Sequence, residues 1–107
     1  KMALRILEGV AERGILICGS GIGMSMVANK FPGIRAAVGH THYSAYQSVE
    51  HDDANIICIG QRVLGIEVTR DIVFTFIEAH YSGAERHTRR IGKIGEIEKK
   101  YSGGQVQ

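Results

Sequence analysis

ILICGSGIGMSMVANK, residues 15–30, is the stretch of sequence that decides the fold. A short apolar run ends in Cys18, a turn with Gly19, Gly21 and Gly23 follows, and the chain resumes as a helix-compatible segment. This order predicts a buried strand, a tight turn and a helix N-terminus. Such a junction gathers backbone N–H groups without partners, and the helix dipole makes it positive. The stretch therefore predicts a site for an anion or a developing oxyanion, with a thiol beside it.

Similar patterns continue on both sides of this stretch. Apolar runs predict strands at residues 15–18, 34–38 and 56–59, and apolar residues at helical spacing predict helices over 1–13, 23–30, 41–51, 66–81 and 91–101. Strands that alternate with helices favour a parallel sheet covered on both faces, a three-layer α/β/α Rossmann-like fold. Because ligands bind beyond the carboxyl ends of strands in such sheets, the loops after residues 18, 38 and 59 are the expected site.

Three local expectations complete this prediction. Gly14 is placed to cap the first helix, and residues 82–90 form a polar, basic loop. The residues expected to pack inward from the helix after the glycine turn are Met24, Met26, Val27 and Ala28.

The composition is that of an ordinary globular protein. Of the 107 residues, 44% are hydrophobic and 22% are charged, and the net charge is +2, so charge does not imply a nucleic-acid partner. No apolar run is long enough for a membrane span, and two cysteines without a targeting segment favour a reduced, cytoplasmic setting. We expect one domain over residues 1–101 and a flexible tail at 102–107.

The glycine turn differs from the common nucleotide-binding loops. The third glycine of a dinucleotide fingerprint would fall at Met24, and His40 stands where its acidic residue would be. No Gly-Lys-Ser/Thr follows, so a Walker A loop is excluded as well. One simpler interpretation stays open, in which the glycines only permit a tight turn.

Cys18 and His51 are the candidates for proton transfer. A free cysteine is often a small buried hydrophobe, but a helix N-terminus facing Cys18 favours its thiolate. Cys58, within a strand, keeps the buried interpretation. His51 ends a helix and is either a proton carrier near neutral pH or a surface histidine. Together with His40 and His42 it lacks the paired spacing of a metal site, so no metal is expected.

The dense basic cluster lies at residues 86–90. Arg86, Arg89 and Arg90 surround His87, and Arg62 follows the third strand. Such a run is either a solvated face or a clamp for phosphate, which guanidinium groups bind bidentately.

Four blocks carry a resemblance to a known family: ILICGSGIGMSMVANK, GIRAAVGHTHYSA, EHDDANIICIGQRVLG and SGAERHTRRI. In this order and spacing they resemble the ribose-5-phosphate isomerase B family, which includes the galactose-6-phosphate isomerase subunits. The resemblance implies an aldose-ketose isomerase of the pentose phosphate pathway that interconverts ribose 5-phosphate and ribulose 5-phosphate through a cis-enediolate. It implies no metal or organic cofactor, no nucleic-acid or membrane partner, and a homodimer or homotetramer with shared active sites. The cysteine at the turn, absent from the galactose-6-phosphate subunits, favours the pentose enzyme.

The resemblance also implies roles for individual residues. Cys18 matches the catalytic base, His51 the proton donor that opens the furanose ring, and Ser20 a residue that assists this opening. The matched substrate contacts are Gly19, Ser20, Gly21, Ile22 and Gly23 in the anion-hole loop, with Asp52, Arg62, Arg86 and Arg90 elsewhere.

Three departures from the family pattern leave alternatives open. Asp52 stands where the family has Asn, and the segment before Arg86 is one residue longer than usual. Only three of the family's five strands are visible, and we expect its N-terminal βα portion, with an Asp-His pair, to be missing from this chain. The alternatives are a non-catalytic sugar-phosphate-binding module, a hexose-6-phosphate isomerase, or an incomplete fragment.

Overall fold

A three-stranded parallel sheet forms the centre of the fold in a computed structural model that describes residues 2–101. The strands are β1 (Gly14–Cys18), β2 (Ala36–Val38) and β3 (Ile56–Gly60), in the order β1-β3-β2. The register places Cys18 opposite Gly60 and Val38 opposite Cys58. The predicted parallel sheet is confirmed. The predicted tail, residues 102–107, lies outside the described residues.

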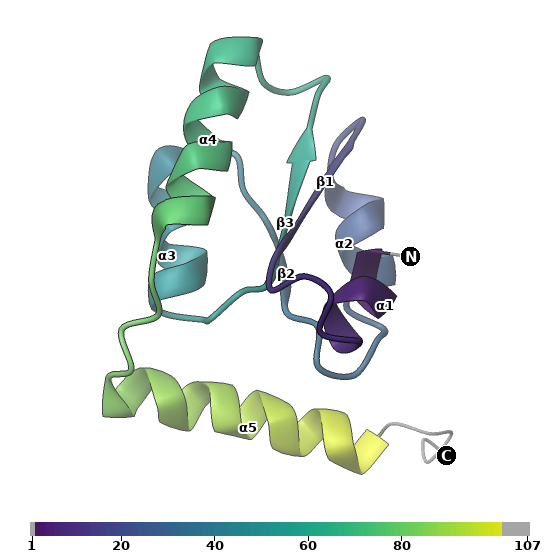
Figure 1. The fold of residues 1–107 in the computed structure, drawn as a ribbon, viewed down its shortest axis with the longest axis vertical. Helices are drawn as coiled ribbons and strands as arrows, with labels where there is room; N and C mark the ends of the chain where they lie inside the picture. Colours follow the sequence, from purple (N-terminus) through teal and green to yellow (C-terminus); the bar gives the residue numbers. More distant parts are fainter. Residues whose placement is uncertain (1, 102–107) are drawn as a thin grey trace.

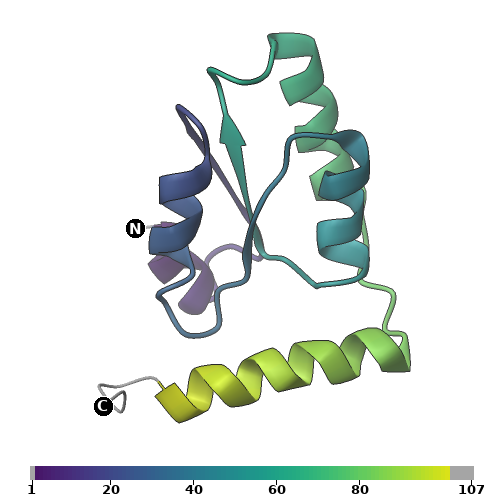
Figure 2. The ribbon, with the colours of Figure 1, turned by 180° about the vertical axis from the view of Figure 1, so that it is seen from behind.

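Helices cover both faces of this sheet, as Figures 1 and 2 show from opposite sides. Helices α3 (His42–Glu50) and α4 (Ile66–Glu78) lie on one face, and α1 (Met2–Leu7) and α2 (Ile22–Ala28) lie on the other. The last helix, α5 (Glu85–Tyr101), lies across the end of the layers at which β3 begins. The predicted three-layer α/β/α arrangement is therefore confirmed.

β3 is the strand on which both layers pack. All five of its residues are buried, and side chains alternate between the two faces of a strand. Ile57 and Ile59 accordingly join the core beneath α3 and α4, whereas Ile56 and Cys58 join the core beneath α1 and α2. β1 differs from the prediction of a strand buried on both faces, because it lies at an edge of the described sheet and Ile17 is 53% exposed.

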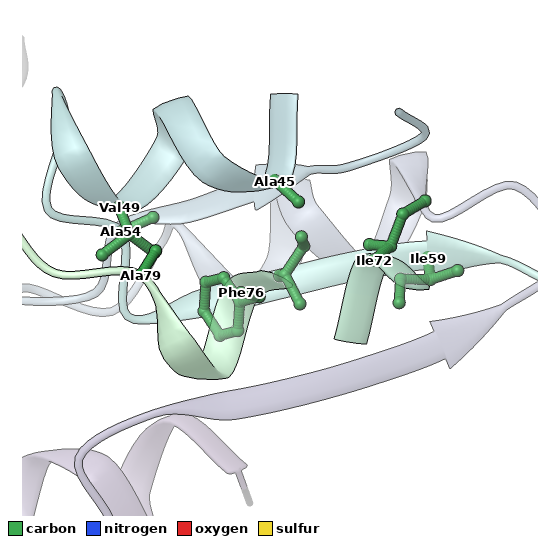
Figure 3. Close-up of a cluster of buried hydrophobic side chains, with 8 residues drawn as sticks. Ala45, Val49, Ala54, Ile59, Ile72, Phe76 and Ala79 are labelled. Atoms are coloured by element: carbon green, nitrogen blue, oxygen red, sulfur yellow. The ribbon is translucent and has the colours of Figure 1, made fainter. Parts of the chain in front are cut away.

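The larger core lies between β3, α3 and α4 (Figure 3). Phe76 and Ile72 of α4 are fully buried there against Ile59. Ala45 and Val49 line the facing side of α3, and these short side chains let the helix approach the sheet closely. Helix 66–81 was predicted to cover the sheet, and α4 does so, although it ends three residues earlier. The Arg13 side chain donates hydrogen bonds to backbone carbonyl oxygens at the end of α4, and its Nη2 lies 2.7 Å from Ala79 O.

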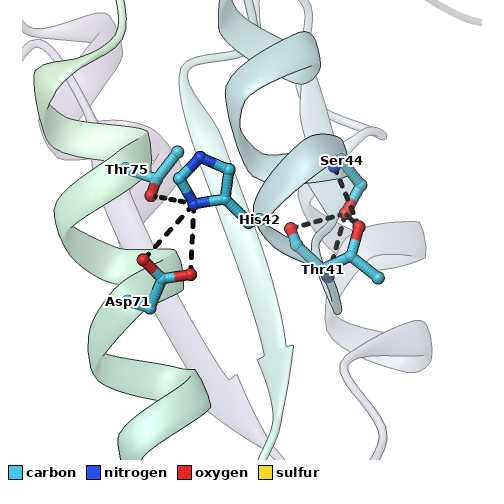
Figure 4. A network of polar contacts seen from close by, with 5 residues as sticks. All are labelled: Thr41, His42, Ser44, Asp71 and Thr75. Atoms are coloured by element: carbon cyan, nitrogen blue, oxygen red, sulfur yellow. Dashed lines mark hydrogen bonds and ion pairs between the residues drawn. The ribbon is translucent and has the colours of Figure 1, made fainter.

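The first turn of α3 begins at Thr41, as predicted. Thr41 Oγ1 accepts the Ser44 N–H at 3.0 Å, and the Ser44 hydroxyl oxygen accepts the Thr41 N–H at 3.1 Å (Figure 4). The next residue, His42, connects α3 to α4. Its Nδ1 lies 3.2 Å from Asp71 Oδ2 and 3.1 Å from Thr75 Oγ1. These contacts place His42 at the opposite end of α3 from His51.

Three local expectations were wrong. The first helix ends at Leu7, because Gly9 turns the chain in the left-handed conformation (φ +80°), and Gly14 opens β1 instead of capping a helix. Only Ala28 of the four expected α2 residues is buried. Met26 and Val27 are 63% and 61% exposed, because α2 packs on the sheet through its Ala28 side.

The third wrong expectation concerns residues 82–90. α5 begins at Glu85, six residues earlier than predicted, so the basic cluster lies on a helix and not in a loop. Glu85 accepts a hydrogen bond from Arg89 one turn later at 3.2 Å. Within residues 2–101, no helix is both long enough and apolar enough to cross a membrane.

Phe76 and Phe74 provide a matched test of the core between α3, α4 and β3. Both lie on α4, but Phe76 is fully buried and Phe74 is 59% exposed. Phe76→Ala leaves a cavity and is expected to lower the free energy of unfolding by about 3–5 kcal/mol in urea titrations. Phe74→Ala should change it by less than about 0.5 kcal/mol. Equal losses for the two variants would contradict this packing.

Candidate active site

The chain from Cys18 to Gly23, here named the cysteine loop, follows the carboxyl end of β1. Cys18 is half-buried, and its Sγ accepts the Gly21 N–H at 3.1 Å. Ser20 Oγ accepts the Ile22 N–H at 3.2 Å, so this side chain also turns toward the loop backbone. The loop thus combines a partly accessible nucleophilic sulfur with inward-facing backbone donors.

Two glycines allow the cysteine loop to lie directly on the end of β3. Gly21 has φ +82°, and a Cβ there would lie 3.2 Å from Cys58 O. A Cβ on Gly60 would lie 2.7 Å from the Ser20 carbonyl group. Gln61 N–H also donates to Cys18 O at 2.7 Å. These glycines are therefore required by close backbone packing as well as by the turn itself.

An open cavity of about 510 Å³ lies over the cysteine loop. It is lined by Cys18, Gly19, Ser20, Gly23, Met24, Arg62 and Val63. Arg62 follows β3, and its Cδ lies 3.6 Å from the position that a Cβ on Gly19 would occupy. The structure therefore brings the predicted residues Cys18, Ser20 and Arg62 together around one cavity.

Cys58 differs from Cys18 in its surroundings. It is fully buried within β3, and burial, followed by the nearby Cys18, raises its pKa to about 11. The Cys58 thiol is therefore protonated at neutral pH and belongs to the core. Both cysteines are free.

A second group, here named the histidine cluster, combines the predicted residues His51, Asp52, Arg86 and Arg90 with Glu50 and His87. His51 ends α3, and its ring stacks on the His87 ring of α5 with a centroid separation of 4.2 Å. His51 Nε2 lies 3.4 Å from Glu50 Oε1. Burial, then His51, Arg86 and Arg90, lower the pKa of His87. A buried neutral histidine thus lies beside a histidine that faces a carboxylate.

The arginines of α5 have different partners. Arg89 pairs with Glu85 at 3.2 Å, whereas Arg86 and Arg90 form no ion pair with any residue in the described range 2–101. Arg86 and Arg90 are one helical turn apart and flank His87 in sequence. With Arg89 and Lys93 they line a cavity of about 240 Å³. This arrangement leaves two guanidinium groups available for an anion.

The polar residues of the loop between α3 and β3 have two different roles: some hold the loop in place, and one lies at the histidine cluster. Asp53 adopts φ +49°, and its carbonyl oxygen accepts the Arg35 Nε–H at 2.7 Å. Asn55 Oδ1 accepts the Arg35 N–H at 2.8 Å, so both residues hold the loop against the start of β2. Asp52 instead acts on His87, because its negative charge partly offsets the lowering of the His87 pKa.

The two groups lie at opposite ends of the sheet. Cys18 is paired with Gly60 at the carboxyl end of β3, whereas His51 precedes the loop that enters β3 at Ile56. Figure 1 shows α5 across this entry end and the turn after β1 at the other. The five residues of β3, at about 3.3 Å per step, separate the ends by roughly 13 Å. Within one chain, the structure does not bring His51, Asp52, Arg86 and Arg90 to the cysteine loop.

Glu50 and His87 are the residues of this group that were given no role from the sequence. A signal for His87 was present, because His87, Ile91 and Ile94 follow helical spacing and would have extended α5 toward its observed start. Among residues 2–101, no group of three or more histidine, cysteine, aspartate or glutamate side chains is arranged to hold a metal ion.

Comparison with known proteins identifies the family. The sequence model of the Ribose/Galactose Isomerase family matches residues 1–94. The chain belongs to this family. It is 44% identical over 100 residues to ribose-5-phosphate isomerase B of Escherichia coli, covering 94% of this chain and 66% of the relative. It is 41% identical to D-erythrulose-4-phosphate isomerase of Pectobacterium atrosepticum, covering 91% of this chain and 63% of the relative.

A solved structure of another member of the ribose/galactose isomerase family has the same fold. Ribose-5-phosphate isomerase B of Clostridium thermocellum superposes with a TM-score of 0.90 at 54% identity, covering 94% of this chain and 67% of the other. By comparison, the chain spans just under two thirds of the length of the Escherichia coli and Pectobacterium atrosepticum relatives. The predicted family and its Rossmann-like fold are confirmed.

Gly60 and Gly23 provide a matched test of the contact between the cysteine loop and β3. A Cβ at Gly60 would clash with the Ser20 backbone, whereas one at Gly23 would meet nothing within 4 Å. Gly60→Ala is expected to lower the free energy of unfolding by about 1–3 kcal/mol. Gly23→Ala, within α2, should leave it unchanged or raise it by up to about 1 kcal/mol. Urea titrations measure both, and an unchanged stability for Gly60→Ala would contradict this contact.

Proposed function

We propose that this chain carries the residues of a sugar-phosphate isomerase that interconverts ribose 5-phosphate and ribulose 5-phosphate. Each active site would combine the cysteine loop of one copy with the histidine cluster of a second copy. The observation that carries the proposal is the half-buried Cys18 sulfur, which accepts a backbone N–H and opens onto a cavity with an arginine at its rim.

The chemistry at the cysteine loop is proton transfer between two adjacent carbons. In the open-chain aldose, the Cys18 thiolate removes the proton from C2 and leaves a cis-enediolate. The same proton, or one exchanged with solvent, returns to C1, while the hydroxyl proton moves from O2 to O1, which gives the ketose. Backbone N–H groups of residues 19–23 stabilise the enediolate oxygen, each by about 3 kcal/mol when well placed. Ser20, whose hydroxyl lies at the same cavity, assists the preceding ring opening.

The histidine cluster supplies the two other requirements of the reaction. Ribose 5-phosphate is mostly a closed furanose, so a proton must move between its ring oxygen and its anomeric hydroxyl before isomerisation. His51, beside Glu50, carries this proton. Arg86 and Arg90, which lack acidic partners within residues 2–101, bind the phosphate together with Arg62. Asp52 lies next to His51 and selects among substrates through its charge.

The distance between the two groups supports association of two copies. A proton donor must come within about 2.6–3.2 Å of the atom it serves, but one strand length separates the groups within a chain. Exposed apolar side chains at both ends support an interface. Met26 and Val27 lie on α2 near the cysteine loop, and Ile94 and Ile97 lie on α5. A homodimer or homotetramer with shared sites satisfies this geometry, and a cytoplasmic location suits its sugar-phosphate substrate.

Two other functions make different predictions for the same site. The name of the Pectobacterium relative specifies a four-carbon sugar phosphate, so members of this family differ in substrate length. A hexose-6-phosphate isomerase would prefer six-carbon substrates in a panel. A non-catalytic sugar-phosphate-binding module, which the acid at Asp52 favours, would bind phosphate esters without exchanging the proton at C2.

Cys18→Ala tests the proposed function directly. In the intact protein, loss of the base is expected to lower kcat for ribose 5-phosphate by about a thousandfold and to abolish washout of deuterium from C2. Cys58→Ala is the matched control, because Cys58 is fully buried and does not line the cavity, and the kcat of this variant should stay within about threefold of the wild-type value. Turnover by Cys18→Ala near the wild-type rate would contradict the assignment. Phosphate-ester binding without exchange in the wild type would favour the binding module.

A further inference from the structure

His87 is a buried histidine that neither the resemblance nor the proposed chemistry uses. Only 4% of its surface is exposed, although α5 is otherwise a largely exposed helix. Its ring stacks on His51 at 4.2 Å with an interplanar angle of 30°. The ring that would transfer the proton in sugar opening therefore rests on a second imidazole.

The chain before α5 holds the His87 ring in this position. Ser82 Oγ lies 2.8 Å from His87 Nδ1 and accepts the Ala84 N–H at 3.1 Å. The Ser82 N–H donates to Glu50 O at 3.0 Å, which ties the segment to the last turn of α3. Because Ser82 Oγ accepts the Ala84 N–H, its own hydroxyl proton is free to be donated to Nδ1 of a neutral His87. Both histidine rings are thus anchored to the same end of α3.

The charges around the pair are unequal. His87 is buried and faces Arg86 and Arg90 on its own helix, as well as His51 on α3, and all of these lower its pKa. Asp52, from the loop after α3, opposes them more weakly. His51, in contrast, has Glu50 Oε1 at 3.4 Å. The neutral form of the His87 ring is therefore favoured.

We infer that His87 is a positioning residue for His51: its buried ring, stacked on the His51 ring, fixes the plane in which His51 lies. This inference rests on the proposed function, in which His51 opens the furanose ring. The effect of losing the stacked His87 ring on catalysis therefore depends on the substrate. Only a substrate whose ring must be opened requires His87.

Two substrates separate this role from a structural one. Ribose 5-phosphate is a furanose, whereas ribulose 5-phosphate stays open because its phosphate blocks the oxygen that would close the ring. In the intact protein, His87→Ala should lower kcat/KM for ribose 5-phosphate at least about tenfold and for ribulose 5-phosphate less than about twofold. His87→Phe keeps a neutral stacked ring and should restore the ribose 5-phosphate value to within about threefold of wild type. The control is His80→Ala, an exposed histidine, with unchanged kinetics.

The outcomes are distinguishable from failure of the proposed function. Equal losses on both substrates, or no loss, would overturn the inference. His51→Ala should show the same substrate split as His87→Ala; if it shows none, ring opening by His51 is wrong. A readout without substrate is the NMR spectrum of the histidine ring protons. His87→Ala removes the ring that stacks on His51 and should shift the His51 signals. Unshifted His51 signals would also overturn the inference.

Discussion

The burial of β3 on both faces and both edges is the constraint on which the rest of this structure depends. β1 and β2 pair with its two edges, and its alternating side chains fill the cores on either side. Five consecutive apolar or small residues, Ile56–Gly60, meet this requirement because none of them needs solvent. The final residue must also lack a side chain, since the Ser20 backbone occupies the space that a Cβ on Gly60 would need. The strand that supports the core thus also sets the position of the cysteine loop.

The same strand separates two kinds of chemical environment. At its carboxyl end, backbone N–H groups and a thiol lie beside a cavity, which suits a negative charge that develops during reaction. At its amino end, histidines, carboxylates and guanidinium groups meet, which suits proton transfer to a neutral sugar and binding of a permanent anion. A reaction that needs both environments requires the carboxyl end of one sheet to face the amino end of another. The proposed pairing of two copies follows from this requirement. The stacked His87 acts only at the amino end of β3, where it positions the His51 ring.

Much of this arrangement was predictable from the sequence. The strand–turn–helix around Cys18, the start of α3 at Thr41 and the buried strand at 56–59 depend on local signals, namely glycines, a capping residue and a continuous apolar run. The α5 start was missed because its first turn contains only polar residues, and its one buried side chain is a histidine. Met26 and Val27 were assigned to the core because helical spacing identifies an apolar stripe without specifying which side meets the sheet. The separation of Cys18 from His51 was also missed. The sequence contained the signal, because His51 comes before a strand and Cys18 comes after one.

The central claim, that the two environments act together across two copies, is tested most directly by mixing inactive variants. Cys18→Ala and His51→Ala would each be prepared separately, dissociated, combined in equal amounts and allowed to re-associate before ribose 5-phosphate turnover is measured. Each variant alone is expected to be inactive. In random dimers, about half are mixed and carry one intact site of two, so the mixture should recover about a quarter of the wild-type rate. A mixture of confirmed heterodimers that stays as inactive as the separate variants would contradict the shared site.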